Sequence, residues 1–175
     1  MCALDEAGPR VAGRADTQVR PYAGFRPGAA VRRKVIIDTD PGTDDAIALM
    51  MALSSPDLDV LALTTFGANA ALRHTSRNAL RVLEYMGRED IPVYKGGSRP
   101  LKGRFTYGYY YHGPAGLTVR LPLPAGRPRP EAATDYIIRK TRENPGEVTL
   151  VALGPLTNVA RALQREPGLA RWTRD

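Results

Sequence analysis

The sequence predicts an α/β protein with an open, mostly parallel, Rossmann-like sheet and helices on both faces. From residue 34 onward, short apolar runs rich in β-branched residues alternate with longer segments of strong helix formers. This alternation is typical of parallel strands joined by crossover helices. The first apolar run, Val35-Ile36-Ile37, is followed at once by carboxylates and a Pro-Gly turn. Polar groups in that position are expected at the carboxyl end of a strand, where open α/β sheets bind ligands.

Local signals place the elements along the chain. The candidate strands are residues 34–38, 59–65, 91–94 and 147–153, and the candidate helices are residues 44–54, 71–86, 131–143 and 156–165. Ser55-Pro56 ends the first helix, Gly87 caps the second and Pro167 follows the last. In the second helix apolar residues recur at helical spacing, so one face is expected to be buried.

The residues before the first strand differ from the rest of the chain. Residues 1–33 are rich in Arg, Gly and Pro and show no apolar periodicity. Such a composition predicts a disordered extension. The folded portion is therefore expected to comprise residues 34–175.

Composition and charge argue against several classes of function. The formal net charge is +7, but residues 35–98 hold nine acidic and five basic side chains. The basic excess lies in Gly- and Pro-rich segments without a nucleic-acid-reading motif, so no nucleic-acid partner is expected. No apolar run is long enough to span a bilayer, and the amino terminus lacks a secretory signal core, which favours a cytoplasmic protein. A single cysteine, Cys2, argues against disulfides and cysteine metal clusters.

Four carboxylates follow the first predicted strand within eight positions: Asp38, Asp40, Asp44 and Asp45. Like charges so close together repel one another unless a cation or substrate hydroxyls separate them. Asp44 and Asp45 could act only on the dipole of the next helix. Asp38 and Asp40, however, point to the same side of an extended strand end. The pattern predicts a metal or polar-ligand site, and oxygen-only ligands favour Ca²⁺ or Mg²⁺.

Residues 38–49 read Asp-Thr-Asp-Pro-Gly-Thr-Asp-Asp-Ala-Ile-Ala-Leu, which closely resembles the opening motif of the inosine-uridine preferring nucleoside hydrolases. Three more segments are similar to that family in the expected order. They are residues 64–69 followed by 77–80, the His-Gly loop at 112–117, and the strand-to-helix turn at 151–158. The resemblance covers roughly residues 34–175.

The resemblance implies a Ca²⁺ site and a general base. Asp40 and Asp45 would be ligands of the ion, and Leu153 would offer its main-chain carbonyl to it. Asp40 would also deprotonate the attacking water. Carboxylates around the ribose would stabilise the positive charge that develops when an N-glycosidic bond breaks, and a cation would lower the pKa of the water.

The same resemblance implies roles for residues that contact substrate. Asp44 would hydrogen-bond a ribose hydroxyl, and Asn69 would contact the sugar or the water. Asp38 would support the loop. His112 would lie near the leaving base, although a lone histidine is more often structural. The expected partner is a ribonucleoside, and a homo-oligomer is possible because members of the family form dimers or tetramers.

The chain departs from the family in three ways. Ala68 stands where the family usually has glycine before the asparagine of its loop, and Pro114 and Ala115 supply no polar side chain. Members of the family are also considerably longer, with a further aspartate ligand and ribose-binding residues in their second half. We therefore expect a truncated sheet with an exposed edge at residues 147–153.

Two alternative functions remain open from the sequence. The chain could be a catalytically inactive, truncated or degenerate fragment of such an enzyme. A haloacid-dehalogenase-like Mg²⁺ phosphatase also begins with an apolar strand and Asp-x-Asp, but its threonine lies one position closer to the second aspartate than Thr43 does here.

A long connection, residues 96–130, is the least regular part of the predicted domain. Five aromatic side chains gather just before His112: Phe105, Tyr107, Tyr109, Tyr110 and Tyr111. Loops of this length are often functional lids, and tyrosines can stack on a nucleobase. We favour the alternative that most of them pack the loop onto the domain or fill a subunit contact.

Overall fold

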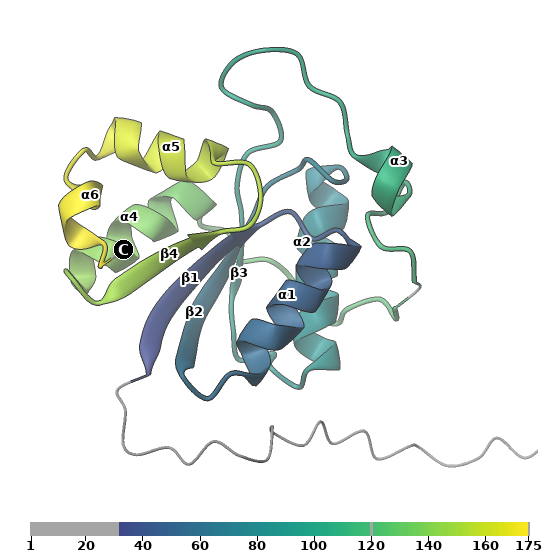
Figure 1. The fold of residues 1–175 in the computed structure, drawn as a ribbon, viewed down its shortest axis with the longest axis horizontal. Helices are drawn as coiled ribbons and strands as arrows, with labels where there is room; N and C mark the ends of the chain where they lie inside the picture. The colour runs from purple at the N-terminus through teal and green to yellow at the C-terminus, as the bar shows by residue number, and fades with distance from the viewer. Residues whose placement is uncertain (1–31, 120, 175) are drawn as a thin grey trace, which may run out of the picture.

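The structure is a computed structural model that describes residues 32–119 and 121–174 (Figure 1). The prediction of a disordered extension thus falls almost wholly outside the described residues. Arg33 already belongs to the first strand, so the folded portion begins one residue earlier than predicted.

All eight predicted elements are present, and no end differs from its prediction by more than two residues. In chain order the elements are β1 (Arg33–Thr39), α1 (Thr43–Ser54), β2 (Leu58–Thr65), α2 (Leu72–Tyr85), β3 (Val93–Lys95), α3 (Tyr109–His112), α4 (Ala133–Glu143), β4 (Val148–Ala152), α5 (Thr157–Arg165) and α6 (Leu169–Trp172). The two short helices α3 and α6 were not predicted, because four residues are too few to display a helical period.

The four strands form one parallel sheet in the order β3-β2-β1-β4. The chain moves outward from β1 to β2 and β3, and then returns to place β4 on the other side of β1. The strand order therefore reverses between β1 and β4, and such a reversal is the usual ligand-binding position of an open α/β sheet. Asp38 lies there, opposite Thr64 of β2 and Ala152 of β4.

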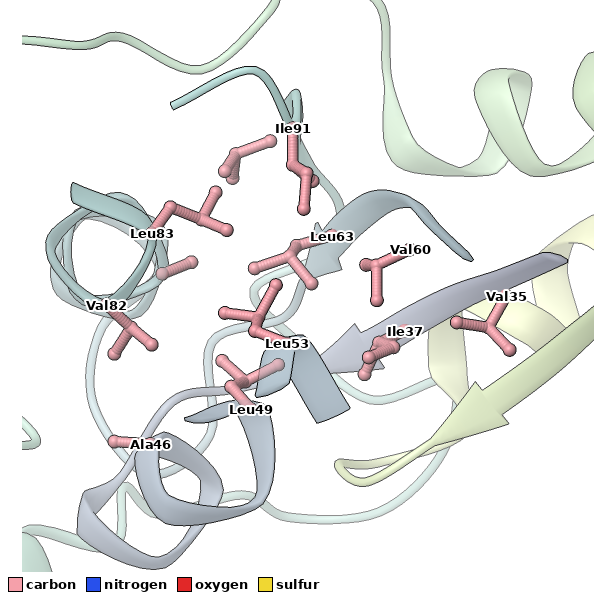
Figure 2. Close-up of a cluster of buried hydrophobic side chains, with 12 residues drawn as sticks. Val35, Ile37, Ala46, Leu49, Leu53, Val60, Leu63, Val82, Leu83 and Ile91 are labelled. Carbon is pink, nitrogen blue, oxygen red and sulfur yellow. The ribbon is translucent and has the colours of Figure 1, made fainter. Parts of the chain in front are cut away.

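Helices cover both faces of the sheet, as predicted. Helices α1 and α2 lie on one face, and α4, α5 and α6 lie on the other (Figure 1). Figure 2 shows the core beneath α1 and α2, where Val35 and Ile37 of β1 meet Leu49 of α1 and Val82 of α2. The opposite face of β1 presents Ile36 to a second core formed with α4, α5 and α6. Because alternate residues of β1 enter different cores, the strand is buried on both faces.

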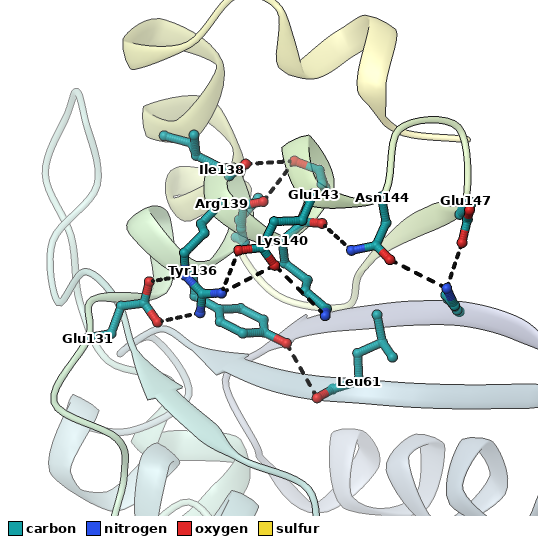
Figure 3. A network of polar contacts seen from close by, with 12 residues as sticks. Leu61, Glu131, Tyr136, Ile138, Arg139, Lys140, Glu143, Asn144 and Glu147 are labelled. Atoms are coloured by element: carbon teal, nitrogen blue, oxygen red, sulfur yellow. Dashed lines mark hydrogen bonds and ion pairs between the residues drawn. The ribbon is translucent and has the colours of Figure 1, made fainter.

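A network of paired charges lies on helix α4 (Figure 3). The Arg139 guanidinium contacts Glu131 at 2.8 Å and Glu143 at 3.1 Å. Beneath it, the rings of Tyr136 and Tyr94 stack with centroids 3.9 Å apart. These contacts hold α4 against the sheet.

Strand β4 is an edge of the described sheet, as the sequence predicted. Thr173 makes a single bridge to Val148 there, while Leu153 and Leu156 just beyond the strand remain 42% and 63% exposed. The described helices include none that is both long and apolar enough to cross a membrane. Oligomeric state and cytoplasmic localisation stay predictions.

Candidate active site

The candidate site lies at the carboxyl end of β1, where the strand order reverses. Asp38 is the last residue but one of β1, Asp40 follows the strand, and Asp45 lies in the first turn of α1. All three carboxylates are buried, with 7% or less of each residue exposed. No cationic side chain of the described residues bonds to any of the three carboxylates. Burial of three carboxylates is unfavourable unless a ligand compensates their negative charge.

Asp38 is held by neutral donors from two other elements. Its Oδ1 accepts hydrogen bonds from the Thr64 hydroxyl at 2.6 Å and from Asn158 Nδ2 at 2.8 Å. Its Oδ2 is buried and has no hydrogen-bond partner among the described residues. Burial raises the pKa of Asp38 to about 6, although the two hydrogen bonds oppose that rise. The unpaired oxygen marks a position that a proton or a cation would satisfy.

Asp40 lies in the turn between β1 and α1. The Asn69 backbone N–H donates to Asp40 Oδ2 at 2.7 Å, and Asn69 Nδ2 donates to the Asp40 carbonyl at 3.1 Å. Burial raises the pKa of Asp40 to about 7, and the charges of Asp45 and Asp38 raise it further against the hydrogen bond from Asn69.

The turn after β4 closes against Asp40. Leu153 N–H donates to the Asp38 carbonyl at 2.8 Å, which fixes the turn beside β1. A Cβ added to Gly154 would lie only 2.4 Å from Asp40 Oδ1. Glycine is thus required here for the backbone to approach the carboxylate. The structure therefore brings the main chain at Leu153, the predicted source of a carbonyl ligand, next to Asp40.

Asp45 is oriented by three donors. The Thr39 hydroxyl donates to its Oδ1 at 2.8 Å, while Gly42 N–H and Asn69 Nδ2 donate to its Oδ2 at 3.1 and 2.9 Å. Burial raises the pKa of Asp45, and the bonds from Thr39 and Gly42 oppose the shift. Asn69 thus bonds to both Asp40 and Asp45. Asn69 therefore holds these two carboxylates in place relative to each other. Its contact with substrate stays a prediction.

Asp44 and His112 form the outer part of the site. The Asp44 side chain is 78% exposed and its Oδ1 lies 3.8 Å from His112 Nδ1. The Thr43 N–H also points to His112 Nδ1, at 3.4 Å. The loop that contains His112 is thereby held against the start of α1. Asp44 is free to meet a ligand, whereas Asp45 one residue later is enclosed.

Of the two roles favoured for most rings of the aromatic loop, packing onto the domain and filling a subunit contact, the structure bears only on the first. Tyr110 and Tyr111 are 92% and 76% exposed, so they do not pack the loop onto the domain. Tyr107 stacks on Tyr109 with ring centroids 4.9 Å apart, and Phe105 meets Tyr107 edge to face. These rings contact one another, and the loop is fixed by Gly108 N–H, which donates to the Ala68 carbonyl at 2.9 Å.

Two asparagines that received no catalytic role from the sequence organise the site. Asn158 is fully buried: its Nδ2 bonds to Asp38, and its Oδ1 accepts from Gly97 N–H at 2.9 Å. Asn78 Nδ2 donates to the carbonyls of Pro41 and Ala115. Both residues occur in the segments that resemble the family, and that was the only signal in the sequence for Asn158.

The side chains alone do not complete a metal centre. Among the described residues, no group of three or more histidine, cysteine, aspartate or glutamate side chains is arranged to hold a metal ion. The candidate ligands are two carboxylates, Asp40 and Asp45, together with the adjacent main chain at Leu153. All of them provide oxygen, which suits a hard cation.

Comparison with known proteins identifies what this arrangement is similar to. The family model described as inosine-uridine preferring nucleoside hydrolase matches residues 35–175. Uridine nucleosidase 1 of Arabidopsis thaliana is 45% identical over 139 residues, which cover 78% of this chain and 41% of that protein. The family match argues against the phosphatase alternative.

Solved structures show the same relationship. The plant nucleoside hydrolase PpNRh1 matches with a TM-score of 0.78 and 46% identity, over 82% of this chain and 46% of that one. The purine-preferring ribonucleoside hydrolase from Gardnerella vaginalis matches with a TM-score of 0.76 and 31% identity, over 81% and 46% of the two chains. The chain thus spans less than half the length of the relatives it matches.

Proposed function

This chain belongs to the inosine-uridine preferring nucleoside hydrolase family, and we propose from that premise that it contributes the carboxylate cluster of a ribonucleoside-hydrolysing site. The products of the reaction would be ribose and the free base. The observation that supports the proposal most strongly is the convergence of three buried carboxylates, Asp38, Asp40 and Asp45, at the reversal of strand order.

The reaction requires a proton acceptor near the sugar. A water oxygen forms a bond to C1′ of the ribose, and the bond from C1′ to the base nitrogen breaks with its electron pair leaving on the base. The water then loses a proton and the base gains one. We assign the water's proton to Asp40, because residues 38–49 resemble the family's opening motif and Asp40 lies where that motif has its general base; without a cation, burial raises the pKa of Asp40 to about 7. A cation beside Asp40 would lower that pKa and keep the carboxylate ready to accept.

Ca²⁺ fits the donors that are present. The unpaired Asp38 Oδ2 and the close approach of Gly154 to Asp40 indicate a position built for a small charged group. Asp40, Asp45 and the Leu153 carbonyl would hold the ion, and Asp38 would support them. When bound, the ion lowers the pKa of water and orients it. Ca²⁺ takes six to eight oxygens, so nucleoside hydroxyls, water or oxygens outside the described residues would supply the others.

The exposed groups of the site would contact the nucleoside. Asp44 is the carboxylate with free access to solvent, and it would accept a hydrogen bond from a ribose hydroxyl. Asn69 would contact the sugar or the attacking water while it spaces Asp40 from Asp45. His112 lies 3.8 Å from Asp44 and would stand near the leaving base.

A second candidate function, cation binding without turnover, is favoured by the ligand count. Two carboxylates and one carbonyl provide fewer oxygens than Ca²⁺ prefers, and the chain spans only 41% of Arabidopsis uridine nucleosidase 1. In that case the isolated chain would bind Ca²⁺ weakly and would not release ribose.

One experiment separates the two functions. Ribose release from inosine and uridine is measured for the 175-residue chain with and without Ca²⁺, together with Ca²⁺ binding by calorimetry. For the active enzyme we expect Ca²⁺-dependent release that Asp40→Asn lowers by about 10²–10⁴-fold. The matched control is Asp57→Asn, because Asp57 is exposed in the turn before β2. Ca²⁺ binding without release would select the second function, and neither binding nor release would contradict both.

A further inference from the structure

A second polar pocket, of about 400 Å³, lies beside the first half of α2. Its basic lining comes from three different segments: Arg73 and Arg77 from α2, Lys95 from the end of β3, and Arg127 from the connection between α3 and α4. Apolar walls are provided by Leu80, Leu123 and neighbouring prolines. The volume is in the range of pockets that bind small organic molecules.

The basic groups of this pocket have no anionic partner among the described residues. None of Arg73, Arg77, Lys95 and Arg127 makes a side-chain hydrogen bond or ion pair within the part of the chain that the structure describes, and no acidic residue of that part lines the pocket. Arg73 and Arg77 lie four residues apart on one helical face, where like charges destabilise a helix. By contrast, Arg139 and Arg142 of α4 and Arg165 of α5 form ion pairs, for example Arg165 with Asp135 at 2.6 Å. These four basic side chains therefore concentrate positive potential in one pocket.

The positive potential also acts on a neighbouring side chain. Partial burial lowers the pKa of His74, and the charges of Arg73, Arg77 and Arg81 lower it further. The shift of His74 thus reflects the positive potential that Arg73 and Arg77 create beside the pocket.

The far wall of the pocket is fixed rather than loose. Arg81 Nε donates to the Pro122 carbonyl at 3.0 Å, and Gly126 N–H donates to Glu84 Oε1 at 3.0 Å. Arg129 N–H donates to the Val93 carbonyl at 2.8 Å. Residues 122–129 are therefore attached to α2 and to β3 along their length, and the pocket is formed before any ligand enters.

We propose that this pocket binds a small phosphomonoester through its phosphate group. Arginine guanidinium groups bind phosphate oxygens with paired, charge-assisted hydrogen bonds, and Leu80 and Leu123 contact the organic body. The acidic cluster at the end of β1 repels a phosphate dianion, so this ligand occupies a site separate from that of the nucleoside. The inference goes beyond the proposed hydrolysis and does not depend on it.

The test is calorimetric titration of the 175-residue chain without Ca²⁺, using uridine 5′-monophosphate, uridine, inorganic phosphate and a 12-nucleotide single-stranded DNA as probes. We expect saturable binding of uridine 5′-monophosphate, weaker binding of inorganic phosphate and none of uridine. Arg77→Gln and Lys95→Gln are each expected to weaken binding by about tenfold, and added salt should weaken it as well. Because the readout is binding without Ca²⁺, failure here leaves the hydrolase proposal untouched.

The matched control is Arg171→Gln, an exposed arginine on α6, on the other face of the sheet (Figure 1). It should leave the affinity unchanged, and thermal melts of every variant verify folding. Equal affinity of wild type and both pocket variants would overturn the proposal. Equal binding of phosphate and the nucleotide would overturn the role of the apolar wall. Binding of the DNA without saturable binding of the nucleotide would indicate a nucleic-acid surface and would also overturn the proposal.

Discussion

Two clusters of charged side chains in this molecule are arranged in opposite ways. The cluster on α4 is exposed and balanced, with Arg139 between Glu131 and Glu143 (Figure 3). The cluster at the end of β1 is buried and of one sign, with Asp38, Asp40 and Asp45 held only by neutral donors. Exposed, paired charges add little to stability and need no ligand, whereas buried, unpaired carboxylates are costly and imply one. The difference supports the second cluster as the candidate functional site.

The largest effect is expected from removing the buried amide that holds Asp38. Asn158→Ala should lower the free energy of unfolding by about 2–3 kcal/mol, because Gly97 N–H and an Asp38 oxygen lose their buried partner. Urea denaturation measures the change. Asn144→Ala is the comparison in the exposed cluster, where Asn144 bonds to Lys140 and Lys34 near solvent. Equal losses for the two variants would contradict the distinction between the clusters.

The next effect concerns the approach of the β4 turn to Asp40. Gly154→Ala places a methyl group where Asp40 Oδ1 now lies, so the carboxylate must move. We expect the affinity for Ca²⁺, measured by calorimetry, to fall by about tenfold, since ligand placement determines affinity. Gly126→Ala serves as the control because its added Cβ meets only ordinary contacts, the nearest at 3.5 Å. An unchanged affinity in Gly154→Ala would argue that the ion binds elsewhere.

The buried cluster should also make stability depend on pH with a definite sign. The pKa values of Asp38 and Asp40, about 6 and about 7, lie above their ordinary value of 3.8, so the folded chain binds more protons than the unfolded one. The stabilisation that these two carboxylates contribute is then fully present below pH 4 and is lost as the pH rises through 6 and 7. We expect the Ca²⁺-free chain to melt about 5 °C lower at pH 8 than at pH 5.

Two additions sharpen that pH experiment. Ca²⁺ at pH 8 should restore the melting temperature, because the ion replaces the proton as the compensating charge. Asp38→Asn should reduce the difference between the two pH values. A melting temperature that rises with pH in the absence of Ca²⁺ would be the opposite result and would show that these carboxylates are already compensated.

The smallest effect is expected in the exposed cluster. Arg139→Gln removes the ion pairs with Glu131 and Glu143, yet it should cost only about 0.5–1 kcal/mol in urea denaturation and less in 1 M NaCl. Ca²⁺ affinity should not change. A loss comparable to that of Asn158→Ala would mean that the network on α4, including the contact of Arg139 with the Tyr136 ring at 5.3 Å, is an essential structural element.

The sequence predicted the fold because its signals were local. The strands are short apolar runs and the long helices are segments of strong helix formers, several of them followed by a stop residue, so all eight were found within two residues of their ends. Helices α3 and α6 were missed because one turn of helix has no period. Tyr110 and Tyr111 do not pack onto the domain, since apolar content alone does not say which side of a loop meets it, and their role in a subunit contact stays a prediction.

For the candidate site, the sequence by itself determined the carboxylates between residues 38 and 45, because all four lie within eight positions directly after an apolar run. The tertiary structure alone decided how they differ. Asp44 is exposed and Asp45 enclosed by Thr39 and Asn69, and Asp38 meets Asn158, which lies 120 residues away in the chain. The pocket beside α2 likewise unites Arg73, Lys95 and Arg127 from three segments. Burial and pairing across such distances depend on which strands become neighbours, and a local pattern does not contain that information.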